Sequence, residues 1–313
     1  FSRCWVPTPC NNGAHCMSNF PSSSSIDTLA IVGVGLIGGS FAAALRKAGR
    51  VKRVLGVGRR PGPLVQAKQL GLIDEAVSLE EAACEADLIL LASPVGAMPA
   101  LFRGLAPHLK ASALVTDAGS TKADVVKAAY EALGDRVGQF IPGHPIAGAE
   151  KTGPESADAG LYEGRHVVLT PLPENSAAMR QQLILLWEAV GARIVLMDPH
   201  SHDRALASVS HLPHFLASVF MEQVAACTDA DLRLGLAGTG FRDFTRVAAG
   251  SAEMWRDIFM ANREAVLREL GDFRATLDEA ESALRDEDAQ KLYDMLERAA
   301  LARRFWGSRS GLL

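Results

Sequence analysis

A short apolar run followed at once by closely spaced glycines constrains the fold of this chain more than any other feature. The run is Leu29–Val34, the glycine-rich stretch is Gly33–Ser40, and a helical pattern follows over Phe41–Ala48. Strand, Gly-x-Gly-x-x-Gly and helix in this order are typical of the first turn of a dinucleotide-binding sheet. A lone glycine pattern is weak evidence, but this one has the correct neighbours on both sides. We therefore predict a Rossmann-type α/β domain.

Each position in this turn has a distinct expected role. Gly33 should make the tight turn, Gly35 should let the backbone approach a pyrophosphate, and Gly38 should let the helix pack closely on the strand. Leu36 and Ile37 lie in the same turn, and the N-terminus of the helix that follows attracts an anion. We predict that these five residues bind the phosphates of a dinucleotide.

The end of the second predicted strand, Arg53–Val57, bears on which dinucleotide is bound. NAD-specific sites usually carry Asp or Glu here, in contact with the adenosine ribose. In this chain Gly58 is followed by Arg59 and Arg60. Two guanidinium groups suit a 2′-phosphate, since each offers a bidentate fork to its oxygens. We predict that NADP is preferred. NAD stays possible if an arginine stacks on adenine, and two solvated loop arginines are the alternative.

Strand and helix patterns alternate as far as about residue 198. Further strands are predicted at Leu88–Ala92, Ala113–Thr116, Val137–Ile141, Arg165–Thr170 and Arg193–Met197, with a helix over Ala177–Val190. This alternation predicts one βαβ-rich sheet in a domain over residues 26–198. In an open α/β sheet, ligands bind beyond the carboxyl ends of the strands. Ser93, Pro94 and Asp117 lie at or just after strand ends and are predicted to contact the cofactor.

After about Asp198 the strand patterns stop. Residues 199–313 show apolar positions at three- and four-residue spacing, which predicts an all-α second domain. Helices this apolar need a partner, so we expect burial against the first domain and across a homodimer. A self-contained helical bundle is the alternative that the sequence leaves open.

Composition argues against several classes of protein. A net charge of -4 leaves no basic footprint, which argues against a nucleic-acid partner. No apolar run reaches the roughly 18 residues that a membrane-spanning helix needs. We expect a soluble, cytoplasmic protein without a membrane partner. Cysteine usage implies no disulfide framework, which fits a reducing compartment, and Cys84 and Cys227 are expected to be buried free thiols.

The first 25 residues are expected to lie outside the fold. They show neither periodicity nor the apolar segment of a signal peptide, and Met17 precedes a serine-rich lead into the first strand. We interpret residues 1–25 as a disordered or non-native extension, with the working protein starting near Met17. Three cysteines and His15 in this segment suggest a metal-binding tail as the alternative. The cysteines lack the close spacing of a zinc site, so no metal is predicted.

The stretch Gly143–Gly148, which reads Gly-His-Pro-Ile-Ala-Gly, is where we place the chemistry. His144 lies between a glycine and Pro145, so we expect it outside any helix or strand interior. The predicted strand Val137–Ile141 runs straight into it, which puts the imidazole beyond a carboxyl strand end. A rigid turn whose histidine only caps a neighbouring group is the alternative. The following loop, Glu150–Leu161, predicts a mobile flap beside the site.

Three histidines, His202, His211 and His214, lie within SHDRALASVSHLPH at the start of the helical half. If the helix persists through Pro213, the last two share one face. No carboxylate or cysteine stands at matching spacing for a metal site. We expect some of these histidines to line an anionic site and others to form structural hydrogen bonds.

A glycine-rich entry to a later helix carries three charges, Arg242, Asp243 and Arg246. Asp243 and Arg246 are three residues apart, so the carboxylate can hold the guanidinium in place. A surface ion pair of little energetic value is the alternative. Trp255, nine residues further on, is expected either in the core or in a pocket wall.

Together these stretches resemble the prephenate/arogenate dehydrogenase family of tyrosine biosynthesis. The resemblance runs from about Leu29 to about Arg268, and its matching stretches are VGVGLIGGS, LASPV, VTDAGSTK, PGHPIAG, GPESADAGLYEGRHVVLTP, SHLPH and GFRDFTRVAAGSAEMW. The first is common to many dehydrogenases. The order DxGSxK, GHPxAG, SHLPH is far more specific to this family.

The resemblance implies NAD(P)-dependent oxidative decarboxylation of prephenate to 4-hydroxyphenylpyruvate, of arogenate to tyrosine, or of both. His144 matches the family's catalytic histidine, which contacts the ring hydroxyl at C4 and would act as general base. Ser120 matches a serine that hydrogen-bonds both this histidine and the hydroxyl. His144 must be neutral for this role, so activity should fall as the pH drops through its pKa.

The resemblance also implies which side chains surround the substrate. His214 and Arg246 match residues around its carboxylates, and Trp255 matches an aromatic side chain of the pocket. His202 and Asp243 would orient their neighbours without touching the substrate. The fork of a guanidinium such as that of Arg246 supplies both charge and orientation for a carboxylate.

The chain departs from the family pattern in some features, and other classes of protein share its architecture. No acidic residue ends the second strand, which weakens the case for NAD. The chain is expected to lack an ACT regulatory domain and a fused chorismate mutase, so any inhibition by tyrosine would be competition at the active site. β-Hydroxyacid dehydrogenases and imine reductases share the architecture, but they place Lys or Asp where this chain has its histidine cluster. A non-catalytic NADP-sensing regulator is disfavoured by the catalytic matches.

Overall fold

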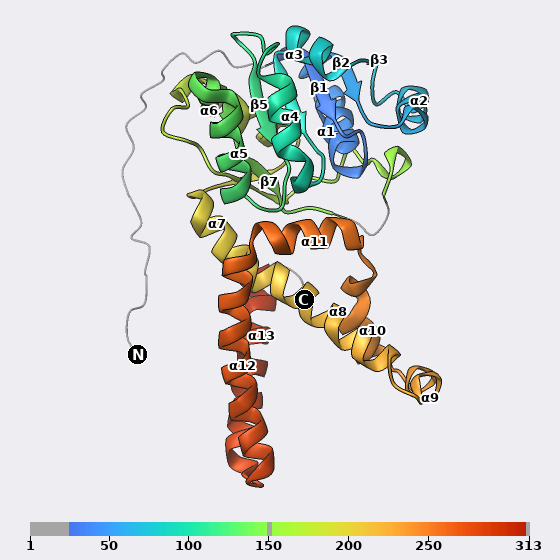
Figure 1. Ribbon diagram of the computed structural model, residues 1–313, viewed down its shortest axis with the longest axis vertical. Helices are drawn as coiled ribbons and strands as arrows, with labels where there is room; N and C mark the ends of the chain where they lie inside the picture. The colour runs from blue at the N-terminus through green and yellow to red at the C-terminus, as the bar shows by residue number, and fades with distance from the viewer. Residues whose placement is uncertain (1–24, 149–151, 311–313) are drawn as a thin grey trace.

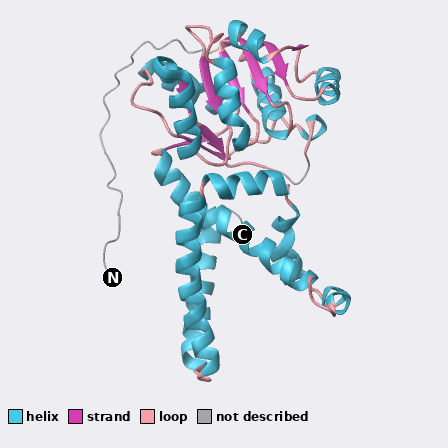
Figure 2. Cartoon of the chain, viewed as in Figure 1, coloured by secondary structure: helices cyan, strands magenta, loops and turns pink. Residues whose placement is uncertain are grey.

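The computed structural model describes residues 25–148 and 152–310 of the 313-residue chain. An α/β body lies at one end, and long helices extend away from it (Figure 1). Among the described residues, all strands belong to this body and everything that follows the last strand is helix or loop (Figure 2). The predicted N-terminal extension lies, up to residue 24, outside the described residues.

A six-stranded parallel sheet forms the centre of the α/β body, in the order β3-β2-β1-β4-β5-β6. Its strands are β1 (Ile26–Val32), β2 (Val51–Val57), β3 (Glu75–Ala76), β4 (Leu88–Leu91), β5 (Leu114–Asp117) and β6 (Phe140–Ile141). The connecting helices are α1 (Leu36–Lys47), α2 (Pro61–Gln69), α3 (Leu79–Glu85), α4 (Met98–Leu105) and α5 (Ala123–Leu133). In this strand order a dinucleotide crosses the carboxyl edge where the order reverses, beside β1 and β4.

Burial on both faces explains why the last four residues of β1 and of β2, and all of β4, read as apolar runs. One face packs against α1 and α6 (Ala177–Ala189), where the rings of Phe41, Tyr162 and Trp187 contact one another. The other face packs against α3, α4 and α5, and the ring centroids of Phe102 and Phe140 lie 4.8 Å apart there. The α/β body therefore has its own apolar core on each side of the sheet.

The prediction of a single sheet is wrong, because the last strands form a second, smaller one. β7 (Gly143–Pro145) pairs antiparallel with β8 (His166–Leu169), which pairs parallel with β9 (Arg193–Leu196). The break falls at Pro142, which has no N–H to continue the ladder of β6. Consequently His144 lies inside a short strand and not, as expected, outside any strand interior.

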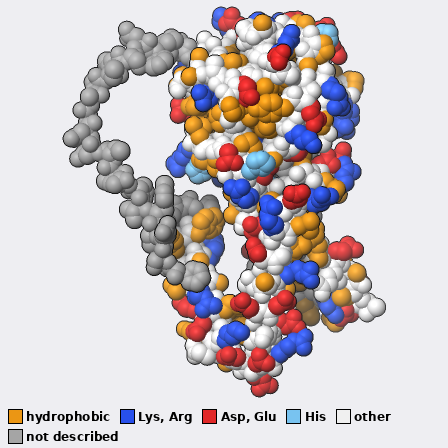
Figure 3. Space-filling view, turned by 60° about the vertical axis from the view of Figure 1, so that its left-hand side comes forward, with side chains coloured by type: hydrophobic (Ala, Val, Ile, Leu, Met, Phe, Trp, Pro, Cys, Tyr) orange, Lys and Arg blue, Asp and Glu red, His pale blue; other side chains and the backbone are white. Residues whose placement is uncertain are grey.

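The helical half has far fewer buried side chains. Its elements are α7 (Pro199–Leu206), a π-helical turn (Ala207–His211), α8 (Leu212–Ala225), α9 (Ala230–Gly235), α10 (Thr239–Thr245), α11 (Ala252–Ala261), α12 (Arg263–Arg285) and α13 (Ala289–Ser310). In the described part of the chain, its own buried cluster is Ala207, Ala265 and Val266. Large apolar side chains stay exposed along it among charged ones (Figure 3). This pattern favours a surface that a partner covers over a self-contained bundle.

Two helices of this half meet the carboxyl edge of the sheet. α11 packs against the 3-10 turn Val95–Ala97, and its Ile258 enters the core of the α/β body. A Cβ on Gly96 would collide with the Asp257 carboxylate of α11, so the two segments touch closely. α7 packs against α5. The two halves are thus joined at the edge where a ligand is expected.

Two smaller expectations are corrected. The segment after the undescribed residues 149–151 is docked on α1 and is no free flap. The N–H of Asp158 donates to Ser40 Oγ at 2.8 Å, and the Tyr162 hydroxyl donates to the Ile37 carbonyl at 2.6 Å. The two cysteines predicted to be buried are not: Cys84 is exposed, because α3 turns its alanines inwards, and Cys227 is half-buried.

Candidate active site

The glycine turn after β1 has the geometry that a dinucleotide needs. Gly33 has φ +100°, and a Cβ there would lie 2.5 Å from a backbone carbonyl oxygen. A Cβ on Gly38 would lie 2.5 Å from the Gly33 carbonyl oxygen, so only glycine lets α1 pack this closely. A Cβ on Gly35 would meet nothing within 4 Å, which leaves open space for a ligand. Leu36 and Ile37 begin α1, whose first turn carries no acidic residue and whose N-cap forms no side-chain hydrogen bond. This end of the helix therefore fits a phosphate.

Arg59 and Arg60 stand at the end of β2, and both are exposed. Arg60 is the N-cap residue of α2, and Pro61 opens that helix. The first turn of α2 carries no acidic residue. Two guanidinium groups and a helix N-terminus therefore occupy the same edge, which suits an anionic group.

Ser93 and Pro94 follow β4 at the same edge. Ser93 is half-buried, and its Oγ donates to the Val32 carbonyl at 3.1 Å, which ties the end of β4 to the end of β1. Pro94 is exposed. Both lie beside the glycine turn, so their contact with a cofactor stays a prediction that the arrangement permits.

Asp117 was predicted to contact the cofactor, and in the structure its side chain points into the protein. Its carboxylate is fully buried and accepts from the N–H groups of Gly119 at 2.8 Å and Gly143 at 3.0 Å. The ammonium of Lys122, also fully buried, pairs with it and donates to the Gly143 carbonyl at 2.6 Å. The carboxylate is thus occupied inside the protein, where it holds the loop after β5 against the strand of His144. Sequence analysis missed Lys122, although it is the only cation of the DAGSTK stretch.

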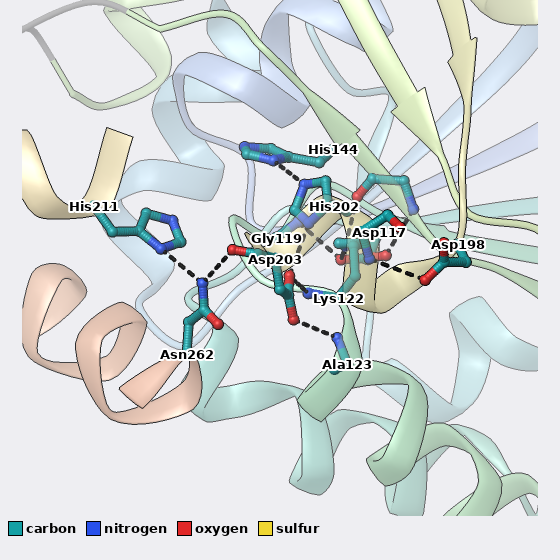
Figure 4. A network of polar contacts seen from close by, with 12 residues as sticks. Asp117, Gly119, Lys122, Ala123, His144, Asp198, His202, Asp203, His211 and Asn262 are labelled. Atoms are coloured by element: carbon teal, nitrogen blue, oxygen red, sulfur yellow. Dashed lines mark hydrogen bonds and ion pairs between the residues drawn. The ribbon is translucent and has the colours of Figure 1, made fainter. Parts of the chain in front are cut away.

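His144 is held by a chain of two further side chains (Figure 4). Its Nδ1 lies 2.8 Å from His202 Nε2, and His202 Nδ1 lies 2.8 Å from Asp203 Oδ1. An ionised carboxylate only accepts, so His202 Nδ1 carries a hydrogen and neutral His202 accepts at Nε2. The hydrogen between the two rings therefore belongs to His144 Nδ1. This leaves Nε2 of His144 as an unprotonated acceptor, which a general base needs.

Asp203 also joins the two halves of the molecule. Its oxygens accept from the backbone N–H groups of Lys122 and Ala123 at 2.8 Å each, so a residue of α7 caps the N-terminus of α5. Burial alone would raise the pKa of this carboxyl, but the hydrogen bonds from His202 and the two N–H groups bring the pKa below its ordinary value. Asp203 therefore stays ionised and orients His202. Sequence analysis missed it, although it directly follows His202.

The surroundings of His144 keep its ring neutral. Desolvation lowers the pKa of His144 well below 6.5, and the charge of nearby Lys122 acts in the same direction. Near pH 7 the ring is therefore ready to accept a proton. Its hydrogen bond to His202, backed by ionised Asp203, stabilises the charged ring once it forms, as in a Ser-His-Asp triad.

The residues predicted around the substrate carboxylates come together on the helical half. The rings of His214 and Trp255 stack, with centroids 3.7 Å apart. His214 Nδ1 donates to the Ser210 carbonyl at 2.9 Å. Burial lowers the pKa of His214, and the charge of Arg246 lowers it further, so the two side chains are close. Asp243 Oδ1 lies 3.6 Å from Arg242 Nε, and both side chains are exposed. The predicted orientation of Arg246 by Asp243 stays a prediction.

Ser120 is half-buried in the loop after β5. The ring of His144 is hydrogen-bonded to His202 and not to Ser120, contrary to the arrangement that the resemblance implied. The backbone of Ser120 instead faces the ring of His211 and acts to raise its pKa. A contact between the Ser120 hydroxyl and the substrate stays a prediction.

The described residues lack the features of two other classes of site. They contain no group of three or more His, Cys, Asp or Glu side chains that could hold a metal ion. No helix among them combines the length and apolar character needed to cross a bilayer.

Two family models match the chain over most of its length. Residues 41–196 match the nucleotide-binding domain of prephenate dehydrogenase, and residues 198–298 match its dimerization domain. The chain belongs to the prephenate dehydrogenase family. Prephenate dehydrogenase of Lactococcus lactis is 36% identical over 269 residues, which is 85% of this chain and 74% of the relative. Cyclohexadienyl dehydrogenase of Zymomonas mobilis is 34% identical, over 88% of this chain and 94% of the relative.

Solved structures of the family have the same fold. Prephenate dehydrogenase of Aquifex aeolicus in complex with hydroxyphenyl propionate and NAD+ has a TM-score of 0.83 at 35% identity, covering 90% of this chain and 98% of that one. Synechocystis arogenate dehydrogenase has a TM-score of 0.76 at 31% identity, covering 89% and 99%. The predicted fold class and family are confirmed. The chain is an NAD(P)-dependent dehydrogenase for oxidative decarboxylation in tyrosine biosynthesis, which sets aside the other oxidoreductases and the non-catalytic regulator.

Proposed function

We propose that this enzyme oxidises prephenate, arogenate or both at ring carbon C4, with His144 as general base. The nicotinamide cofactor, when bound, supplies the acceptor for the hydride that leaves C4. His144 Nε2 takes the hydroxyl proton in the same step. The bond to the ring carboxylate then breaks, CO2 leaves, and its electron pair makes the ring aromatic. The phenol oxygen recovers the proton from His144, so no net proton is released and the base is restored.

The observation that carries this proposal is the chain of contacts from His144 through His202 to Asp203. Asp203 fixes the hydrogen of His202 on Nδ1, and His202 in turn fixes that of His144 on Nδ1. The opposite tautomer of His144 would present an N–H to the substrate hydroxyl and could not remove its proton. The chain of contacts thus selects the reactive form of the ring before the substrate binds.

Recognition of the substrate falls to the helical half in this proposal. Arg246 pairs with a substrate carboxylate, and His214 contacts the same end of the molecule. Trp255, stacked on His214, forms the wall against which the ring lies. Ser120 contacts the hydroxyl from the loop after β5, while Asp243 orients Arg246.

NADP is the cofactor that we propose to be preferred, with NAD possible. Arg59 and Arg60 are exposed at the end of β2, where the N-terminus of α2 adds a favourable field for a 2′-phosphate. The carboxylate with which NAD-specific sites bind the ribose is absent from Val57–Arg60. We further propose a cytoplasmic homodimer, formed through the exposed apolar faces of the helical half, with tyrosine as a competitive inhibitor.

Steady-state rates with each substrate and each cofactor test these proposals together. Turnover of at least one of the two dienols, with a lower KM for NADP than for NAD, is expected. Absence of turnover with both would contradict the substrate assignment, and equal KM values would contradict the cofactor preference. Tyrosine should raise KM for the dienol without lowering kcat, whereas non-competitive inhibition would place its site elsewhere.

A further inference from the structure

Asn262 connects the two groups of polar residues around His144. It is buried at the junction of α11 and α12 and is the N-cap residue of α12. Its Nδ2 donates to the Asp203 carbonyl at 2.7 Å and lies 3.1 Å from Nδ1 of His211 (Figure 4). One amide therefore contacts both α7, which carries the His202–Asp203 pair, and the π-helical turn, which ends at His211.

These two contacts determine which ring nitrogen of His211 holds the hydrogen. A backbone carbonyl only accepts, so the atom of Asn262 that faces Asp203 must be the NH2 group. Its second hydrogen is then directed at His211 Nδ1, which must accept. Neutral His211 therefore carries its hydrogen on Nε2, the nitrogen that faces away from Asn262. A protonated ring would set an N–H of His211 against the NH2 of Asn262.

The charged and titratable neighbours of His211 come from three sides. His202 and Asp203 lie on α7, His214 lies one turn further along the chain, and the backbone of Ser120 faces the ring from the loop after β5. Burial lowers the pKa of His211 to about 4, while the charge of Asp203 and the backbone of Ser120 act to raise it. Trp255 of α11 lies against the ring, with centroids 6.3 Å apart.

A charge on His211 would matter to the reaction, because His211 is close enough to lower the pKa of His144. We propose that Asn262 is a positioning residue that keeps His211 neutral with its hydrogen on Nε2 and keeps α7 in register, so that the Asp203–His202–His144 chain stays aligned. This inference rests on the proposed role of His144 as base. Asn262 does not itself touch the reacting atoms.

Asn262→Asp tests the proposal with almost no change in shape. A carboxylate at this position would accept a hydrogen from His211 Nδ1 and stabilise the charged ring. Because a charged His211 lowers the pKa of His144, we expect the acidic limb of the kcat profile to move down by about one pH unit, and kcat above the limb to fall because the base is weaker. Folded Asn262→Asp enzyme with an unshifted limb would overturn the proposal.

Asn175→Asp is the matched control. Asn175 is equally buried, and its amide also donates to backbone carbonyls, those of Gly138 and Phe140. It lies in the α/β body away from the histidines, so the same substitution should destabilise the protein without moving the limb. An equal shift in both variants would mean that a general loss of structure moves the limb. In Asn262→Asp/His211→Gln the shift should disappear, and its persistence would contradict the role of His211.

Nitrogen NMR of the imidazole groups in the wild-type enzyme requires neither a folded variant nor activity. A neutral His211 with its hydrogen on Nε2 between pH 5.5 and 8 is expected. A hydrogen on Nδ1, or a charged ring at pH 7, would overturn the proposal even if His144 proved to be the base. Conversely, failure of His144 as base would leave this spectrum unchanged, so the two failures are distinguishable.

Discussion

The α/β body and the helical half of this enzyme are stabilised in different ways. The first has an apolar core on each face of its sheet, whereas the described part of the second buries a cluster of only three small side chains of its own. Yet the helical half supplies His202, Asp203 and His211 to the surroundings of His144. Asp203 of α7 accepts hydrogen bonds from the backbone of the α/β body and also contacts His202. The residues that orient His144 therefore also join the two halves.

The largest effect is expected from removing the base, which belongs to the α/β body. His144→Asn should lower kcat about 10³-fold, within the usual range for general base catalysis, and leave cofactor binding nearly intact. Steady-state kinetics and a cofactor titration measure this. His166→Asn changes an exposed histidine on the neighbouring strand and should keep the parent kcat. A parent-like kcat in His144→Asn would remove this residue from the mechanism.

Acid should weaken the junction of the two halves, where the buried histidines lie. Burial lowers the pKa of His211 to about 4, and the pKa values of His144 and His214 are lowered too. Between about pH 6.5 and 4 the unfolded chain therefore binds more protons than the folded one, so stability falls as the pH drops. His211 alone accounts for about 3 kcal/mol at about 1.4 kcal/mol per pKa unit.

Urea unfolding at pH 8 and at pH 4 measures this loss. His211→Gln should lose less free energy of unfolding on acidification than the parent does, because one of the titrating groups is gone. An unfolding free energy that is the same at both pH values would contradict the neutral state of these rings in the folded protein.

Asp203 tests whether the helical half acts through orientation. Asp203→Asn should lower kcat about 10²-fold, because an amide no longer fixes the hydrogen of His202, and should cost about 1 kcal/mol of stability by weakening the cap of α5. Kinetics and urea unfolding report the two effects separately. Asp198→Asn changes the exposed N-cap residue of α7, where asparagine caps a helix as well as aspartate does. Both kcat and the free energy of unfolding should therefore match those of the parent. Loss of stability without loss of kcat in Asp203→Asn would reduce its role to the cap.

The smallest effect concerns the cofactor, whose proposed site lies in the α/β body. Replacing Arg59 and Arg60 together by alanine should raise KM for NADP about tenfold and change KM for NAD little, because only NADP offers a 2′-phosphate. Lys68→Ala removes an exposed cation from the last turn of α2, the helix that follows these arginines. It should change the KM for neither cofactor. Equal losses with both cofactors would contradict the 2′-phosphate interpretation.

The parts of the site that depend on neighbours in sequence were predictable. Gly33, Gly35 and Gly38 occupy one turn, and the structure gives them a left-handed backbone, open space and close packing respectively. The end of β2 was recognised in the same way. Pro142 shows the limit of such reasoning, since its missing N–H was a local signal for the end of the first sheet that the strand pattern concealed.

The remaining parts depend on residues far apart in the chain. Asp203 caps a helix that begins some 80 residues earlier, and Asn262 contacts a carbonyl 59 residues away. Neither stands in a motif, because their partners are backbone groups that any residue supplies. Asp117 shows the same limit: its position suggested a ligand contact, and only the structure shows that a buried lysine and two N–H groups contact its oxygens.

The sequence by itself thus determined the Rossmann-type order of strand, glycine turn and helix and the helical second half, and it singled out His144, the proposed base. Those features follow from periodicity, backbone freedom and the spacing of residues within short segments. Only the tertiary structure decided which nitrogen of His144 is free to take a proton. That choice passes through His202 and Asp203, whose hydrogen bonds exist only when α7 packs against the carboxyl edge of the sheet.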